Sequence, residues 1–143
     1  MNERADFLDA NIILYGIDAG APEAKRRISQ QILGRALAEK SGVISWQIVQ
    51  ETLHVTARKF KTAVSDADRS ALLREVLVPL WTVHPDPALY QAALELQAKL
   101  GFAFYDSLVV AAALHAGCKR LLTEDLQHGQ RIGSLRIENP FRS

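Results

Sequence analysis

The chain has 143 residues, which is enough for one domain with a substantial hydrophobic core and too few for two comfortable ones. Its 48% hydrophobic and 23% charged residues are typical of a globular protein, and its single cysteine, Cys118, excludes an internal disulfide framework. With 17 Lys and Arg against 16 Asp and Glu, the net charge of +1 does not by itself indicate a nucleic-acid partner.

The N-terminal segment is charged and leads into a short apolar run, so it does not resemble a secretory signal. No apolar run approaches the roughly 18 residues of a membrane span. We therefore expect a cytoplasmic protein without a membrane partner, folded as a single domain over residues 1–143.

Short apolar runs separated by longer segments of helical period predict the strands of a sheet. The five predicted strands are residues 5–9, 43–45, 80–84, 120–123 and 135–138. Strands that alternate with helices indicate a parallel sheet covered on both faces. The predicted fold class is therefore α/β, a three-layer α/β/α arrangement around a central, mainly parallel five-stranded sheet.

Apolar spacing predicts helices between these strands. Residues 46–60 carry the stripe Val49, Leu53, Ala57 and Phe60. A second stripe follows Pro87, which suits the first turn of a helix, and consists of Leu89, Ala92, Ala93, Leu96 and Leu100. Acidic residues at Asp66 and Asp68 favour the start of another helix.

Residues 105–116 are apolar almost all round, which predicts a central buried helix that ends at Gly117. Asp106 lies in its first turn, among the aromatic residues Phe102, Phe104 and Tyr105. A helix-start acid stabilised by the helix dipole is one interpretation of Asp106. The other is a half-buried carboxylate, which is costly unless it is paired or bound to a metal.

Two further acids stand where predicted strands end. Asp9 ends the first strand, and Glu124 and Asp125 directly follow residues 120–123. In open α/β sheets the functional crevice lies at the carboxyl ends of the strands, although strand-end acids also serve in turns. Glu51 lies off the apolar stripe of residues 46–60, on a face with His54 and Arg58 that is either solvated or functional.

Several carboxylates that converge on one point repel each other and require a compensating cation. Oxygen ligands without a cysteine or histidine cluster favour hard cations such as Mg²⁺ or Mn²⁺. Such ions orient a water molecule, lower its pKa and stabilise developing charge on a phosphate.

The same residues carry a resemblance to a known family. The segment from Phe7 to Tyr15, Gln50-Glu51, the segment from Phe104 to Ala113, and the segment from Leu121 to Gly129 resemble the motifs of PIN domains in order and spacing. Asp9, Glu51, Asp106 and Asp125 fall on the four acidic positions of the family. Asn11 and Thr123 fall on polar positions that support them.

Within the family, the chain looks most like the toxins of VapBC-type bacterial toxin–antitoxin modules. The resemblance implies an endoribonuclease that uses Mg²⁺ or Mn²⁺, with Asp9, Asp106 and Asp125 as metal ligands. It also implies an RNA substrate, a homodimer and a cognate antitoxin protein. Ala10 departs from the hydroxyl residue of many relatives, and Glu124 stands beside Asp125 as a competing ligand.

Three other functions compete with this reading. A haloacid-dehalogenase-type phosphatase needs a second Asp where this chain has Asn11. A phosphoacceptor domain needs a lysine after a late strand, and none follows residues 135–138. The alternative that stays open is a catalytically weak PIN domain that binds RNA or a partner.

The remaining polar residues of interest have ordinary explanations as well. His54, His84, His115 and His128 lack metal-ligand spacing, although His128 lies close to Asp125 in sequence. The basic runs at residues 25–27 and 58–61 are interpreted as solvated helix faces, and the second could also contact phosphates.

Overall fold

The computed structural model describes residues 6–58 and 64–142. Its strands are β1 (Asp6–Leu8), β2 (Gly42–Ser45), β3 (Trp81–Val83), β4 (Arg120–Leu122), β5 (Arg131–Ile132) and β6 (Leu135–Glu138). Its helices are α1 (Ala10–Ile17), α2 (Glu23–Glu39), α3 (Trp46–Arg58), α4 (Asp66–Leu72), the π-helical turn η1 (Leu73–Leu77), α5 (Val78–Leu80), α6 (Pro87–Leu100) and α7 (Phe104–His115).

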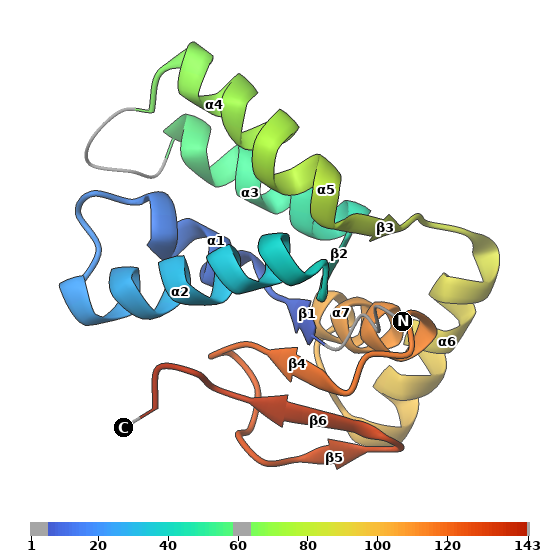
Figure 1. Cartoon of the computed structure of the whole chain (residues 1–143). Helices are drawn as coiled ribbons and strands as arrows, with labels where there is room; N and C mark the ends of the chain where they lie inside the picture. Colours follow the sequence, from blue (N-terminus) through green and yellow to red (C-terminus); the bar gives the residue numbers. More distant parts are fainter. Residues whose placement is uncertain (1–5, 59–63, 143) are drawn as a thin grey trace.

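The strands form one sheet in the order β3-β2-β1-β4-β6-β5. All neighbours are parallel except β5 and β6, which pair antiparallel at one edge. Figure 1 shows α1 and α2 on one side of the central strands and α6 and α7 on the other. The predicted α/β class with a mainly parallel sheet is confirmed.

The hydrophobic core lies on both faces of the central strands. Phe7, Val43, Ile44 and Leu121 are fully buried, because parallel strands are covered by helices on each face. Helix α7 is buried from Ser107 to Ala113, as its continuous apolar sequence predicts. None of the helices in the described part of the chain is long and apolar enough to cross a membrane.

The structure corrects the predicted number of strands from five to six among the described residues. The additional strand, β5, is a two-residue edge piece that pairs with β6 through the turn at residues 133–134. Four of the predicted strands also end or begin at different residues. The first ends at Leu8, because Asp9 caps the next helix by accepting a hydrogen bond from the backbone of Ala10.

Two helices near the N-terminus, α1 and α2, are absent from the sequence-based prediction. Helix α1 is apolar on nearly every side and continues the apolar run of β1, so its period is hidden. Helix α2 has too few apolar residues to show a helical period, since its narrow buried face consists only of Ser29, Leu33 and Ala36. The two helices pack on each other, as Figure 1 shows.

The predicted stripe on the third helix is wrong in part. Val49 is buried, but Ala57 is exposed, and the core-facing positions include Thr52 and Thr56. Polar threonines do not register in an apolar pattern, so the buried face is rotated from the predicted one. Phe60 lies outside the described residues.

The other predicted helices are confirmed. Helix α6 begins at Pro87 and is capped by the side chain of Asp86, and Gly117 after α7 has φ +71°, the left-handed conformation that glycine favours. The helix that begins at Asp66 passes through the π-helical turn η1 just before Pro79, which has no N–H to donate to an α-helical ladder.

Candidate active site

Asp9 sits at the carboxyl end of β1, where the chain turns into α1. Its backbone N–H donates to the carbonyl of Leu122 at 3.0 Å, which ties it to the end of β4. One carboxylate oxygen accepts from the backbone of Ala10 at 2.8 Å, and the other accepts from the Thr123 hydroxyl at 2.7 Å. Two strand ends therefore hold one carboxylate in a fixed orientation.

Asp9 is only 8% exposed, and this burial dominates its electrostatics. Burial raises the pKa of Asp9 to about 6, although the hydrogen bonds from Thr123 and Ala10 act in the opposite direction. The negative charges of Asp125 and Glu51 add to the increase in the pKa of Asp9. A buried acid that ionises with this difficulty favours the approach of a positive charge.

Thr123 connects Asp9 to the loop after β4. Its fully buried hydroxyl donates to Asp9 and accepts from the backbone N–H of Asp125 at 3.1 Å. The backbone N–H of Thr123 donates to the backbone carbonyl of Glu138 in β6 at 3.0 Å. One threonine thus links the orientations of two of the predicted acidic residues.

Asp125 is exposed and accepts a hydrogen bond from the Asn11 side-chain amide at 3.3 Å. Partial loss of hydration by the surrounding chain raises the pKa of Asp125, and the charges of Glu124 and Asp106 raise it further. Asn11 is on the first turn of α1, two residues after Asp9. The structure therefore brings Asp9, Asn11, Thr123 and Asp125 together at one edge of the sheet.

Asp106 approaches the same edge from the first turn of α7. Partial burial raises the pKa of Asp106. Its charge in turn raises the pKa of Asp125, so the two carboxylates are close enough to interact through their charges. The neighbouring ring of Tyr105 is 65% exposed, so the expected aromatic enclosure of Asp106 is incomplete.

Glu51 reaches the site from α3. Its carboxylate accepts a hydrogen bond from the Gln47 side-chain amide at 2.8 Å, and the same amide nitrogen donates to the backbone carbonyl of Tyr105 at 3.3 Å. The charge of Glu51 contributes to the raised pKa of Asp9. Gln47 therefore joins α3 to the start of α7, a role that the sequence pattern does not reveal.

Glu124 acts on Asp125 through its charge, but its carboxylate makes its hydrogen bonds outside this group. Its carboxylate accepts a hydrogen bond from the Tyr15 hydroxyl and forms an ion pair with Lys25 at 2.9 Å. The Lys25 ammonium also lies 4.7 Å from the centre of the Tyr15 ring and 5.5 Å from that of Phe141. We call Tyr15, Lys25, Glu124 and Phe141 the clamp.

The clamp answers the question of which adjacent acid faces the site, since Glu124 is engaged elsewhere and Asp125 is held toward Asn11. It also corrects the interpretation of the basic run at residues 25–27, because Lys25 is half-buried and paired. The sequence signal for this pairing is weak, since Lys25 and Glu124 are 99 residues apart.

His128 does not point freely into the site. Its Nδ1 accepts a hydrogen bond from the backbone N–H of Asn139 at 3.0 Å, which holds the ring against the chain after β6. His54 is on the exposed face of α3. Neither histidine makes a described contact with the acidic residues.

The donor set suits a hard divalent cation, because Asp9, Asp106 and Asp125 offer only carboxylate oxygens. Buried Asp9 is the observation that fits such an ion, because burial raises its pKa and the charges of Asp125 and Glu51 raise it further. Over residues 6–58 and 64–142, however, no three Asp, Glu, His or Cys side chains are gathered tightly enough to ligate one ion. The carboxylates are linked by charge and hydrogen bonds rather than by close contact.

Comparisons with known proteins identify a family and several similar folds. The family model described as PIN domain matches residues 7–131. No curated protein sequence matches the chain. The crystal structure of FitAcB from Neisseria gonorrhoeae superposes with a TM-score of 0.63 at 18% identity, over 96% of this chain and 99% of that one.

Two other solved structures are similar. FitAB bound to the IR36 DNA fragment has a TM-score of 0.69 at 16% identity, over 96% of each chain. Mycobacterium tuberculosis VapC20, a sarcin–ricin loop-cleaving toxin, has a TM-score of 0.61 at 20% identity, over 85% of this chain and 92% of that one. At these identities the structures share the fold, and the family match over most of the chain shows that it belongs to the PIN-domain family.

Proposed function

We propose that this chain is an endoribonuclease, dependent on Mg²⁺ or Mn²⁺, that acts as the toxin of a type II toxin–antitoxin module. The observation that carries the proposal is that Thr123 joins Asp9 and Asp125 at one edge of the sheet, where the charges of Glu51 and Asp106 also act on these two carboxylates. Acids linked in this way at the open end of a parallel sheet create a strong demand for a cation.

In this proposal Asp9, Asp106 and Asp125 hold the metal, which supplies charge neutralisation and an activated water. Thr123 keeps the carboxylate of Asp9 and the backbone of Asp125 in register, since its hydroxyl is bonded to both. Asn11 fixes the side chain of the more exposed Asp125. Glu51 is oriented by Gln47 and faces the site from α3. In the proposal it would contact the metal through a bound water molecule.

The partners of the proposed toxin are RNA, a cognate antitoxin protein and a second copy of the chain in a homodimer. The similar fold of VapC20, a sarcin–ricin loop-cleaving toxin, supports the choice of substrate class. An antitoxin with an arginine-bearing segment would suit the acidic site, because a guanidinium pairs with carboxylates in a bidentate fashion.

The test is cleavage of single-stranded RNA by purified protein with millimolar Mg²⁺ or Mn²⁺, compared with chelator. Asp9→Asn, Asp106→Asn and Asp125→Asn each remove a charged ligand, so each should lower the cleavage rate by more than the roughly 10- to 100-fold loss typical of outer-shell partners. Glu51→Gln should fall within that range, because its role is indirect. Thermal unfolding verifies that each variant is folded.

Near-wild-type cleavage by Asp106→Asn would remove that residue from the site. Absence of metal-dependent cleavage by the wild-type protein, together with intact RNA or antitoxin binding, would favour the catalytically weak binding module instead. Co-expression with the product of an adjacent small reading frame should suppress toxicity and yield a complex. Toxicity that no such product suppresses would count against the toxin role alone.

A further inference from the structure

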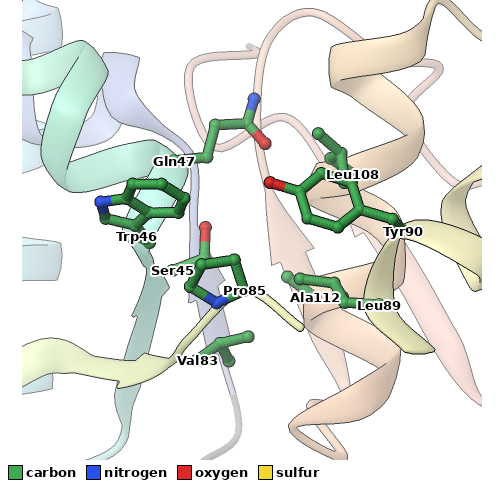
Figure 2. Close-up of a pocket in the computed structure, with 9 residues that line it drawn as sticks. All are labelled: Ser45, Trp46, Gln47, Val83, Pro85, Leu89, Tyr90, Leu108 and Ala112. Atoms are coloured by element: carbon green, nitrogen blue, oxygen red, sulfur yellow. The ribbon is translucent and has the colours of Figure 1, made fainter. Parts of the chain in front are cut away.

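A recess beside the acidic site is lined by aromatic and polar residues that the proposed chemistry does not use. It lies between the end of β2, the start of α3 and the start of α6, and α7 forms its floor (Figure 2). Trp46 and Tyr90 flank it and are 38% and 39% exposed. Large aromatic side chains with this exposure offer flat faces on which a planar ligand can stack.

Two buried polar atoms of the recess lack partners within the described residues. The Ser45 side chain is only 4% exposed, and its buried hydroxyl has no hydrogen-bond partner. The buried carbonyl oxygen of the Gln47 side chain also has none. Figure 2 shows both groups, and the Tyr90 hydroxyl, turned toward the space between α3 and α6. Buried polar groups are normally satisfied, so these groups point to a ligand.

The orientation of the Gln47 amide is fixed by its other contacts. Its nitrogen donates to Glu51 and to the backbone carbonyl of Tyr105, both of which can only accept. The oxygen is therefore the atom of this amide that is left free to accept a hydrogen bond, and Gln47 lines the recess. The hydroxyls of Ser45 and Tyr90 can each donate or accept.

We infer that this recess is the subsite for an unpaired nucleobase of the RNA, next to the nucleotide that is cleaved; the inference rests on the proposed ribonuclease function. The base stacks at the mouth, between the rings of Trp46 and Tyr90, and its N–H edge faces the Gln47 oxygen. The enclosed inner part has room for about one water molecule, which can extend the hydrogen bonding to Ser45.

The location of the recess and its unpaired hydrogen-bonding groups favour this occupant over an apolar one. The side chain of Gln47 contacts both the recess and Glu51, so a base held here places its phosphate beside the acidic site. The walls combine apolar floor residues, Leu108 and Ala112, with unpaired hydrogen-bonding groups. Aromatic stacking with edge hydrogen bonds is the usual way in which proteins read single-stranded RNA.

The experiment measures binding and cleavage of a random-sequence, single-stranded RNA pool. Binding is measured in chelator by fluorescence anisotropy, and cleavage sites are sequenced after addition of Mg²⁺. Trp46→Ala and Tyr90→Ala should each weaken binding by about five- to one-hundred-fold and flatten the base preference at one position beside the cleavage site. Ser45→Ala should change that preference with a smaller loss of affinity.

Leu94→Ala is the matched control, since Leu94 is an exposed residue of α6 that does not line the recess. Cleavage by the wild type with unaltered affinity and base preference in Trp46→Ala and Tyr90→Ala would overturn the subsite and leave the nuclease proposal intact. Binding that depends on Trp46 and Tyr90 without any cleavage would retain the subsite and overturn the nuclease. Loss of antitoxin binding with unchanged RNA binding would assign the recess to a protein partner and overturn the base subsite.

Discussion

The two sides of the acidic site are held in different ways. On the strand side, Asp9 and Asp125 are joined through Thr123, and each accepts a further hydrogen bond of its own. On the helix side, Glu51 depends on the single amide of Gln47. No hydrogen bond or ion pair from the described residues holds the Asp106 carboxylate.

The difference separates a fixed part of the site from an adjustable one. The strand side is built on backbone pairing between β1, β4 and β6, which leaves little freedom. The helix side depends on where α3 and α7 sit relative to the sheet. A cation that binds these acids would therefore move Asp106 and Glu51 more than Asp9, which is consistent with carboxylates that are coupled by charge but not yet in contact.

The largest expected effect concerns the charge of Asp9. Its pKa is about 6 in the folded state against 3.8 for the free side chain, so the folded state binds more protons between these values. Stability should therefore decrease as pH rises from 4 to 7, by about 2 kcal/mol from this residue alone. Asp9→Asn has no such titration, so in chelator it should match or exceed the wild type in stability at pH 7.

Urea unfolding of both proteins in chelator, from pH 4 to pH 8, measures this difference. The free energy of unfolding of Asp9→Asn, relative to that of the wild type, should increase with pH. The altered hydrogen bond to Thr123 should lower the stability of the variant by about 1 kcal/mol at every pH. Addition of Mn²⁺ should stabilise the wild type and have little effect on the variant. A variant that is less stable at pH 7 and equally responsive to Mn²⁺ would make Asp9 a structural residue.

A smaller effect of opposite sign is expected at Thr123. Thr123→Val keeps the volume but removes the hydroxyl that bonds to Asp9 and to the backbone of Asp125. The buried acceptor and donor left behind should lower the free energy of unfolding by about 1–3 kcal/mol. Thr52→Val is the matched control, since the buried Thr52 hydroxyl has no described partner and its removal should be neutral or stabilising.

Equal losses of stability in Thr123→Val and Thr52→Val would mean that the hydrogen bonds of Thr123 do not increase the free energy of unfolding. RNA cleavage adds a second readout for the same pair. Only Thr123→Val should reduce the cleavage rate, because only Thr123 touches the acidic residues.

The smallest expected effect tests whether the clamp belongs to the strand side. Lys25→Met removes the ion pair with Glu124 and the contacts with the Tyr15 and Phe141 rings. Because Lys25 is about one-third exposed, the cost should be about 1 kcal/mol. Arg35→Met breaks the exposed Arg35–Glu39 pair and should cost less than Lys25→Met, because solvent screens an ion pair between exposed side chains. Thermal unfolding that shows no difference between these variants would make the clamp an ordinary surface pair.

The strand side of the site was also the part that the sequence could predict. Asp9, Thr123 and Asp125 end or follow short apolar runs, and parallel strands bring their ends to one edge whatever the details of packing. The helix side was harder, since α3 buries Thr52 and Thr56 where an apolar pattern places Leu53 and Ala57. Contacts between distant segments, such as Gln47 with Tyr105 or Tyr15 with Glu124, leave no periodic trace.

The order of strands has a consequence for the time at which the acidic site is assembled. The central strand β1 is synthesised first, yet one of its two neighbours, β4, begins only at Arg120. The hydrogen bond between Asp9 and Thr123 spans 114 residues. A growing chain on the ribosome therefore carries Asp9 without the strand that orients it until residues 120–123 have been synthesised. A ribonuclease of the kind proposed above would cut short its own synthesis if it were active while its message was still being translated, and this topology delays assembly of the acidic site until β4 has emerged.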